Sequence, residues 1–273
     1  MVRRLILNAD DYGLCAEVNA AIEELIVAGR IYDVSALANG ECWESAVRFL
    51  RQHPQVSVGA HLNAVEGRPI AQSSEIRLLT GADRRFVGLR ELLLRWARRP
   101  LAVTRAVEIE WRAQLERLRA AKLNISHVDS HRHLHAFPPA WRCAVRLAHT
   151  YGIPAIRLPR ERSSLPMRRA AALALDASLT VSKLLSPSIG LRHNDHFLGF
   201  KRAGAYGSSE LIADLLKLPA GLTEVTLHPS LEDGMPYPRL FGNRERLAAI
   251  DESLREQLSD TGIELTTWGA ITE

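Results

Sequence analysis

The feature that most limits the possible folds of this chain is a regular alternation of short β-rich runs with longer segments of helical pattern. The helical segments carry apolar residues on one face and have typical boundaries, such as Gly29 after one and Pro139 at the start of another. Such alternation predicts a parallel sheet, because parallel strands need a long crossover connection. The β-rich runs lie at residues 3–9, 33–39, 56–62, 124–130, 155–159, 190–196, 223–229 and 263–269, and the run at 190–196 is the weakest.

Seven or eight strand–helix units in 273 residues predict an α/β fold in the form of a deformed (β/α) barrel. A doubly wound open sheet is the alternative. We expect residues 1–273 to form a single domain, since no linker or repeat divides them and 47% of the residues are apolar. Residues 66–100 break the alternation and are expected to be an insertion after the third strand, and residues 160–190 are expected to form a cap segment.

Composition argues against a membrane-spanning, a secreted or a nucleic-acid-binding protein. No run approaches the ~20 apolar residues of a membrane-spanning helix, and the apolar run near the N-terminus is too short for a secretory signal. Cys15, Cys42 and Cys143 are far apart in the sequence, which indicates free thiols in a reducing cytoplasm. The net charge of +4 is mild, and no nucleic-acid-binding motif accompanies it. We therefore expect a cytoplasmic protein that does not bind nucleic acid.

Polar side chains suited to catalysis or charge binding follow five of the expected strands. The active site of a (β/α) barrel lies at the carboxyl ends of its strands, so such residues should converge there. One of them alone would be weak evidence, since a lone buried histidine is more often structural. The agreement of five strand ends predicts a site, and they carry Asp10 and Asp11, His61, the histidines of residues 126–138, Arg157 and His228.

The stretch SHVDSHRHLHAFP holds four of the chain's ten histidines. Strand alternation places His127, Asp129 and His131 on one face. His133 and His135 join this face if the extended path continues. Two imidazoles and one carboxylate, with positions left for water and substrate, form a common catalytic site for a divalent ion. A buried histidine–aspartate network without a metal is the alternative.

Asp10 and Asp11 are neighbours at the end of the first expected strand. Adjacent residues there point in different directions, so one aspartate can bind a metal while the other stays free as a base. The alternative is an aspartate-rich turn in which one aspartate caps the helix that begins near residue 15.

Together, the segments NADDYG, GAHL, HVDSHRHLH, RLP and LHP resemble those of the YdjC-like carbohydrate deacetylases in order and spacing. The resemblance runs from residue 3 to about residue 230. The segments IRLPRE, NDHFLGF and LPAGLTEVTLHP are more similar to the hopanoid-biosynthesis-associated branch than to the chitooligosaccharide branch. One departure is Ser230, which stands where the family often has glycine after the His-Pro pair.

This resemblance implies a barrel of the glycoside hydrolase/deacetylase type with one divalent metal ion, usually magnesium and sometimes zinc. By similarity, Asp11, His61 and His131 are the metal ligands, Asp10 is the general base and His228 is the general acid. The residues that would support the ligands or contact the substrate are His127, Asp129, His133, His135, Arg157 and Asp195. Two nitrogen ligands suit zinc better than magnesium, so the metal's identity stays open.

The expected function is therefore metal-dependent removal of the N-acetyl group from an amino sugar, either free or in a glycolipid. A barrel phosphoesterase with one or two metals would share the Asp/His cluster and is one alternative. A non-catalytic sugar-binding protein that has kept the fold is the other.

Residues 165–188 bear on the substrate and on partners. One side of the helix expected there is formed by Leu173, Ala177, Thr180, Val181 and Leu184, and the cations of the segment are Arg168, Arg169 and Lys183. This pattern is typical of a cap helix or of a homodimer contact. A lid that accepts an amphiphile at a membrane surface is the alternative, and it would bring peripheral membrane contact without a transmembrane segment.

Overall fold

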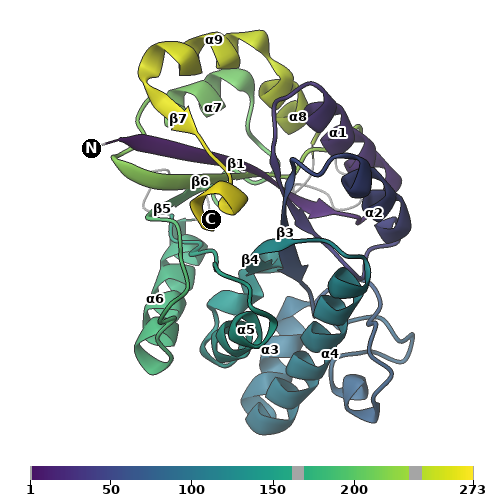
Figure 1. Cartoon of the computed structure of the whole chain (residues 1–273). Coiled ribbons are helices and arrows are strands. Elements are labelled where there is room, and N and C mark those ends of the chain that lie inside the picture. The colour runs from purple at the N-terminus through teal and green to yellow at the C-terminus, as the bar shows by residue number, and fades with distance from the viewer. Residues whose placement is uncertain (1, 162–168, 234–241, 273) are drawn as a thin grey trace.

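The computed structural model describes residues 2–161, 169–233 and 242–272, and it has a curled parallel sheet enclosed by helices (Figure 1). The strands are β1 (Arg3–Tyr12), β2 (Asp33–Ala36), β3 (Ser57–Leu62), β4 (Ile125–Ser130), β5 (His196–Leu198), β6 (Gly221–Leu227) and β7 (Ile263–Leu265). The helices are α1 (Ala16–Val27), α2 (Trp43–Gln52), α3 (Leu89–Arg98), α4 (Pro100–Ala120), α5 (Pro138–Tyr151), α6 (Arg169–Leu185), α7 (Ser208–Leu215), α8 (Asn243–Ile250), α9 (Glu252–Thr261) and α10 (Trp268–Thr272). Two 3-10 turns, η1 (Ser74–Leu78) and η2 (His131–Ala136), complete the elements.

All strand pairings in the sheet are parallel, in the order β4-β3-β2-β1-β6-β5. β7 pairs with the beginning of β1 and β2 pairs with its end, so both lie along the edge of β1 that faces away from β6. Single parallel bridges, Val128–Ile156 and Ala155–Arg192, lead from β4 back toward β5. These pairings confirm the expected deformed (β/α) barrel.

The barrel is irregular where the runs at 155–159 and 190–196 were expected to be strands. Each run contributes only isolated bridges, and β5 begins at the last residue of the second. Pro154 and Pro159 flank the first run, and proline has no N–H to donate to a neighbouring strand. The two prolines therefore limit strand pairing in this run to Ala155 and Ile156.

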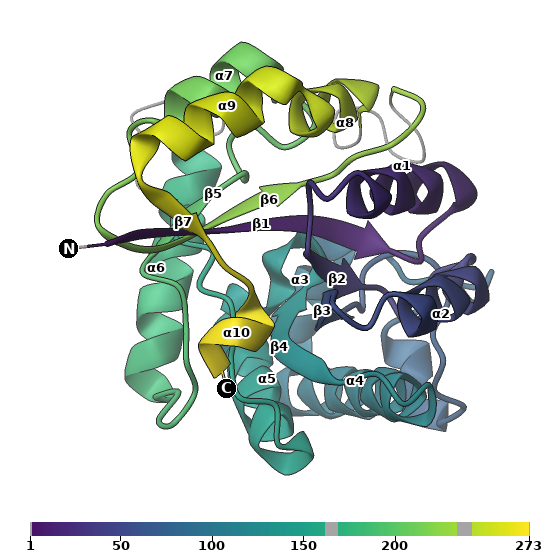
Figure 2. The ribbon, with the colours of Figure 1, turned by 45° about the horizontal axis from the view of Figure 1, so that its top comes forward.

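The helices cover the outside of the sheet (Figures 1 and 2). The apolar stripe of α4 packs into the core, where Val103, Val107, Trp111, Leu115 and Leu118 are all at most 2% exposed. Residues 243–261 form two helices, α8 and α9. Asp251 separates them because its carboxylate accepts a hydrogen bond from Ser253 N at 3.0 Å and caps α9.

The C-terminal helix α10 closes the end of the barrel at which the strands begin (Figure 2). The backbone N–H of Trp268 donates to Asp33 at the start of β2 (2.9 Å), and that of Gly269 donates to Ser57 at the start of β3 (3.0 Å). The indole of Trp268 is fully buried and stacks on His127, with ring centroids 4.9 Å apart. The residues of α10 thus form the floor of the barrel, at the end opposite the carboxyl ends of the strands.

Helix α6 packs on α5 and η2 through Leu175, Leu179 and Ser182, which are buried. The opposite side of the helix is exposed, including Leu173 (61%) and Leu184 (80%). The whole apolar stripe expected on this segment faces outward, and Arg168 lies outside the described residues. Among the described helices, none is both long enough and apolar enough to cross a membrane.

Candidate active site

Residues from several strands meet at the carboxyl end of the barrel. Asp10 and Asp11 come from β1, His61 from β3, His131 from the residue after β4, and His228 from the residue after β6. They line a cavity of about 190 Å³, whose other walls are Leu89, Arg132, His133, Phe200 and Ala203. Parallel strands bring these residues together because all of their carboxyl ends lie at one edge of the sheet.

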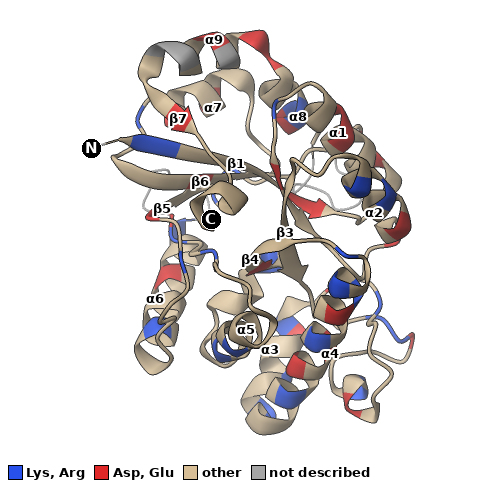
Figure 3. Ribbon diagram, in the orientation of Figure 1, with Lys and Arg blue, Asp and Glu red and all other residues tan. Residues whose placement is uncertain are grey.

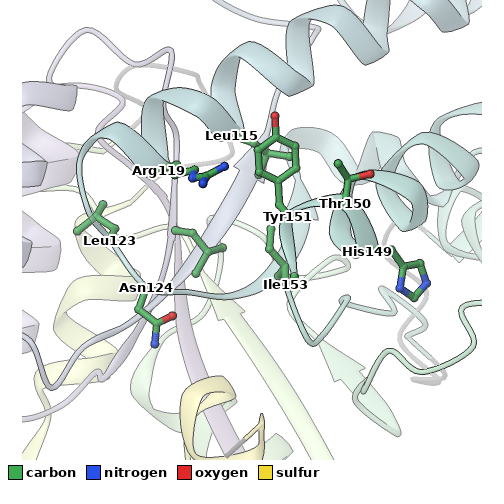
Figure 4. Close-up of a pocket in the computed structure, with 10 residues that line it drawn as sticks. Leu115, Arg119, Leu123, Asn124, His149, Thr150, Tyr151 and Ile153 are labelled. Atoms are coloured by element: carbon green, nitrogen blue, oxygen red, sulfur yellow. The ribbon is translucent and has the colours of Figure 1, made fainter.

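A larger cavity, of about 540 Å³, lies at the opposite end of β4 (Figure 4). Its walls include Arg119, Asn124, His149 and Tyr151, at the ends of α4 and α5 and the start of β4. It contains none of the site residues expected from the sequence, so size alone does not mark the site.

The two aspartates diverge because the end of β1 is irregular. Its register with β2 shifts between Ala9 and Tyr12, and Asp11 adopts a left-handed backbone conformation with φ 66°. Aspartate tolerates this conformation better than most residues do. The Oδ1 atom of Asp11 lies 3.1 Å from His61 Nε2 and 2.6 Å from His131 Nδ1, whereas Asp10 turns toward Arg157.

Each of these imidazoles has a second carboxylate on its other nitrogen. His61 Nδ1 lies 2.9 Å from Asp129 Oδ2, and His131 Nε2 lies 2.9 Å from Glu66 Oε2. Such partners fix the tautomer and orientation of histidines that bind metals. The nitrogens left over, His61 Nε2 and His131 Nδ1, both face Asp11.

Glu66 is a site residue that the sequence did not reveal. It lies in the segment that was expected to be an insertion, four residues after the end of β3. Asn63 holds the loop in place, because its side chain accepts from Val65 N (2.9 Å) and donates to the carbonyl oxygen of Glu66 (2.8 Å). The available signal was an acidic residue in the loop that follows His61 and the end of β3.

The donor set fits a divalent cation. Among the described residues, Asp11, His61 and His131 offer donor atoms that all lie within 4.8 Å of one another. Burial raises the pKa of Asp11, but the fields of His131 and His61 outweigh burial and hold that pKa well below its usual value. Burial lowers the pKa of His131, but Asp11 and Glu66 raise it to about 9. A bound cation would replace these protons and satisfy the same carboxylates.

A second group of donors, Asp10, His61 and Asp129, also lies within 4.8 Å among the described residues. The guanidinium of Arg157 occupies this position, however, and its Nη1 atom contacts both Asp129 and Asp10. A fixed positive charge there repels a second cation. The geometry therefore favours one metal ion over two.

Asp10 is held by a fully buried network. Arg157 donates to both of its oxygens, Nη1 to Oδ2 and Nη2 to Oδ1, each at 2.9 Å. Asn8 donates to Oδ1 at 2.7 Å. Arg157 in turn donates from Nε and Nη2 to Glu224 (2.8–3.0 Å), and Glu224 accepts from the indole Nε1 of Trp268 at 3.1 Å. The sequence pointed to Arg157 but to none of Asn8, Glu224 or Trp268.

His228 faces Asp10 across the cavity, with Nε2 at 3.8 Å from Asp10 Oδ2. Its backbone N–H donates to Glu245 Oε2 at 2.6 Å, which fixes the loop after β6. Burial lowers the pKa of His228, and the nearby Asp10 and Asp11 raise it only in part. The free imidazole is therefore mostly neutral at neutral pH.

The expectation that His133 and His135 continue the face of His131 is wrong. The chain leaves the extended path at His131 and forms the turn η2, in which Arg132 (φ 57°) and His133 (φ 52°) are left-handed. His133 still lines the cavity, against Phe200. His135 lies behind it, between Ser130 Oγ (2.6 Å) and the carbonyl oxygen of Arg157 (3.0 Å).

Two other expected residues neither line the cavity nor hydrogen-bond to a residue that lines it. His127 lies in the barrel interior on Trp268, in a space that Gly59 leaves open, since a Cβ at residue 59 would lie 2.3 Å from the His127 ring. Asp195 is at the opposite end of β6, where its Oδ2 accepts from Leu222 N at 2.9 Å. Asp195 therefore supports the sheet and lies outside the site.

The profile described as YdjC-like protein matches residues 4–260. The chain belongs to this family. A carbohydrate deacetylase of Mus musculus is 32% identical to this YdjC-like chain over 292 residues, covering 96% of the chain and 93% of the relative. One of Brevibacillus brevis is 36% identical over 156 residues, covering 57% of the chain and 59% of the relative.

A solved structure has the same fold. It is described as a candidate cellobiose-phosphate cleavage protein of Enterococcus faecalis V583, and it matches with a TM-score of 0.77 at 21% identity, covering all of both chains. This likeness supports the deformed barrel and carries no information about the reaction.

Proposed function

We propose that this protein is a metal-dependent carbohydrate deacetylase that removes the N-acetyl group from an amino sugar. The observation that carries the proposal is that a cation site (Asp11, His61, His131) and a base–acid pair (Asp10, His228) share one cavity. The family relatives named as carbohydrate deacetylases support the same activity.

Each group in the cavity meets a need of amide hydrolysis. An acetamide reacts slowly because its carbonyl is a poor electrophile and its amine is a poor leaving group. A divalent ion held by Asp11, His61 and His131 supplies polarisation of the carbonyl and a lowered pKa of water. Asp10 accepts the proton of the attacking water, and Arg157 and Asn8 hold the carboxylate in the orientation for that transfer.

His228 is proposed to protonate the departing amine. Its imidazole starts mostly neutral, so the proton it donates must arrive during turnover. Asp10 Oδ2 lies 3.8 Å from His228 Nε2, which is close enough for a small movement to pass that proton on. One proton taken from water by Asp10 can thus serve the leaving group.

A two-metal phosphoesterase is less well supported, because Arg157 lies at the only second donor group found among the described residues. A screen of N-acetylated saccharides and glycolipids for acetate release, with Mg²⁺, Zn²⁺, Mn²⁺ and Co²⁺ supplied in turn, tests the proposal. Phosphate release from phosphate esters without acetate release would favour the phosphoesterase. Saturable sugar binding without either product would favour a non-catalytic binding protein.

Finer features remain proposals. The resemblance favours magnesium, whereas two imidazole ligands favour zinc. The hopanoid-associated segments and the exposed apolar side of α6 support a glycolipid substrate at a membrane surface, and the same side would equally suit a homodimer. The cytoplasmic location, the insertion at 66–100, the cap at 160–190 and the single domain also stay predictions.

We expect Glu66→Ala to weaken metal binding by roughly 10–100-fold, because His131 loses the carboxylate that orients its ring. Glu66→Gln should restore part of this affinity, since an amide oxygen can still accept from His131 Nε2. Equilibrium dialysis with Zn²⁺ or Co²⁺ measures the effect directly. Wild-type affinity in the alanine variant would contradict the role given to Glu66.

Trp268→Phe should lower kcat roughly 3–10-fold with little change in KM, because Glu224 loses a hydrogen bond while the stacking on His127 is kept. Glu224 and Trp268 act through Arg157 on Asp10, so they are positioning residues. Trp96→Phe is the matched control, since it deletes an indole hydrogen bond to Thr104 (2.8 Å) away from the site. Equal effects of both changes on kcat would show that the floor of the barrel plays no part in turnover.

A further inference from the structure

A third hollow, apart from the two cavities described above, lies between η1, the end of α3 and the beginning of α4. It has a volume of about 210 Å³ and is lined by four arginines together with Leu78 and Val103. The four, Arg77, Arg95, Arg98 and Arg99, are called the arginine hollow below. Figure 3 shows basic positions in blue on α3 and α4, in the lower part of the molecule.

Among the described residues, three of these four arginines have no hydrogen-bond or ion-pair partner. Arg95 pairs with Glu91, Nε to Oε1 at 2.9 Å. Within residues 2–161, 169–233 and 242–272, the side chains of Arg77, Arg98 and Arg99 make no hydrogen bond or ion pair. Like charges around one hollow repel each other until an anion enters.

The chemistry of the hollow selects among anions. A guanidinium presents a planar fork of N–H donors that matches the oxygens of phosphate, and clusters of arginines are a common way to bind it. A volume of about 210 Å³ equals that of roughly seven waters in the liquid, so it holds a phosphate and a small attached group.

Two exposed leucines flank the hollow. Leu94 is 43% exposed and lies one turn before Arg98 on the same side of α3, and Leu101 is 86% exposed at the start of α4. Apolar side chains beside unpaired arginines suit a ligand that carries both a phosphate and an apolar part, such as a lipid headgroup with its chains. A soluble phosphate ester would use the arginines alone.

We propose that the arginine hollow is a binding site for a phosphate group. Helix α3 connects it to the candidate active site, because Leu89 at its first residue lines the catalytic cavity. Nine further residues at 1.5 Å each place Arg98 about 14 Å away. A phosphate bound there would anchor a ligand or a surface at a fixed distance from the cavity. The site does not depend on the reaction proposed above.

The test compares wild type with Arg98→Gln/Arg99→Gln. A matched control, Arg48→Gln/Arg142→Gln, removes the same charge from exposed arginines of α2 and α5. Inorganic phosphate and glycerol 3-phosphate are titrated by thermal shift at constant ionic strength. Vesicles of phosphatidylglycerol with phosphatidylcholine are compared with pure phosphatidylcholine vesicles by sedimentation.

We expect wild type and control to bind alike, and the hollow variant to bind at least roughly tenfold more weakly. Loss of glycerol 3-phosphate binding identifies a soluble phosphate ester, and loss confined to phosphatidylglycerol vesicles identifies a lipid headgroup. Equal binding by wild type and the hollow variant, or no binding of any probe by wild type, overturns the proposal. Acetate release from a soluble sugar should be unchanged in the hollow variant.

Discussion

Asp10→Asn should lower kcat for acetate release by roughly 10²–10⁴-fold, the usual contribution of a general base. An amide cannot accept the proton of the attacking water. The change is nearly isosteric, and Arg157 keeps Asp129 and Glu224 as partners, so the fold should survive. Steady-state kinetics with a quantified metal content for each preparation measures the effect.

Glu110→Gln is the matched control for that change. Glu110 is another fully buried acid, but it lies on α4 and accepts from Ile70 N and Ala71 N, away from the cavity. We expect it to cost stability and leave kcat nearly unchanged. If Asp10→Asn kept near wild-type kcat with normal metal content, another residue would have to be the base.

Asp11→Asn should weaken metal binding by more than the 10–100-fold that is typical of losing an outer partner, because it removes the only anionic ligand. A metal at 100 times its Kd stabilises the native state by about 2.7 kcal/mol, so it should raise the Tm of wild type clearly. That rise should disappear in the variant at the same metal concentration. Calorimetry with and without Zn²⁺ or Mg²⁺ measures both.

His133→Gln tests whether this loss is specific. His133 lines the same cavity but is not part of the donor group of Asp11, His61 and His131. Its replacement should leave the metal-dependent rise in Tm intact. A rise that persists in Asp11→Asn and vanishes in His133→Gln would mean that the ion sits elsewhere in the cavity.

The sequence was sufficient to predict the barrel and the residues at its strand ends. Asp10, Asp11, His61 and His228 each follow a β-rich run, and parallel strands place all such positions at one edge. Arg157, in the fifth run, was expected to support the ligands or contact the substrate, and the structure places it on Asp10. The placement of these residues at one edge could be predicted because strand periodicity and barrel topology are encoded locally, residue by residue, whereas their catalytic roles stay predictions.

The residues that position these groups were decided only by the tertiary structure. Glu66 reaches His131 across 65 positions of sequence, and Glu224 reaches Arg157 across 67. Trp268 enters beneath Glu224 from the last helix. No local pattern encodes such pairs, because they depend on how distant segments pack.

Local periodicity also failed where the backbone changed its path. The left-handed conformations of Arg132 and His133 end the alternation after His131, so that of the two later histidines His133 lines the cavity and His135 does not. A step from extended to left-handed backbone reverses the direction of side chains, and the surrounding packing selects it. The sequence by itself thus determined the fold class and which strand ends carry the polar residues of the proposed site. The tertiary structure alone decided how each side chain is aimed and which buried partners hold it, because those contacts form only when the barrel closes.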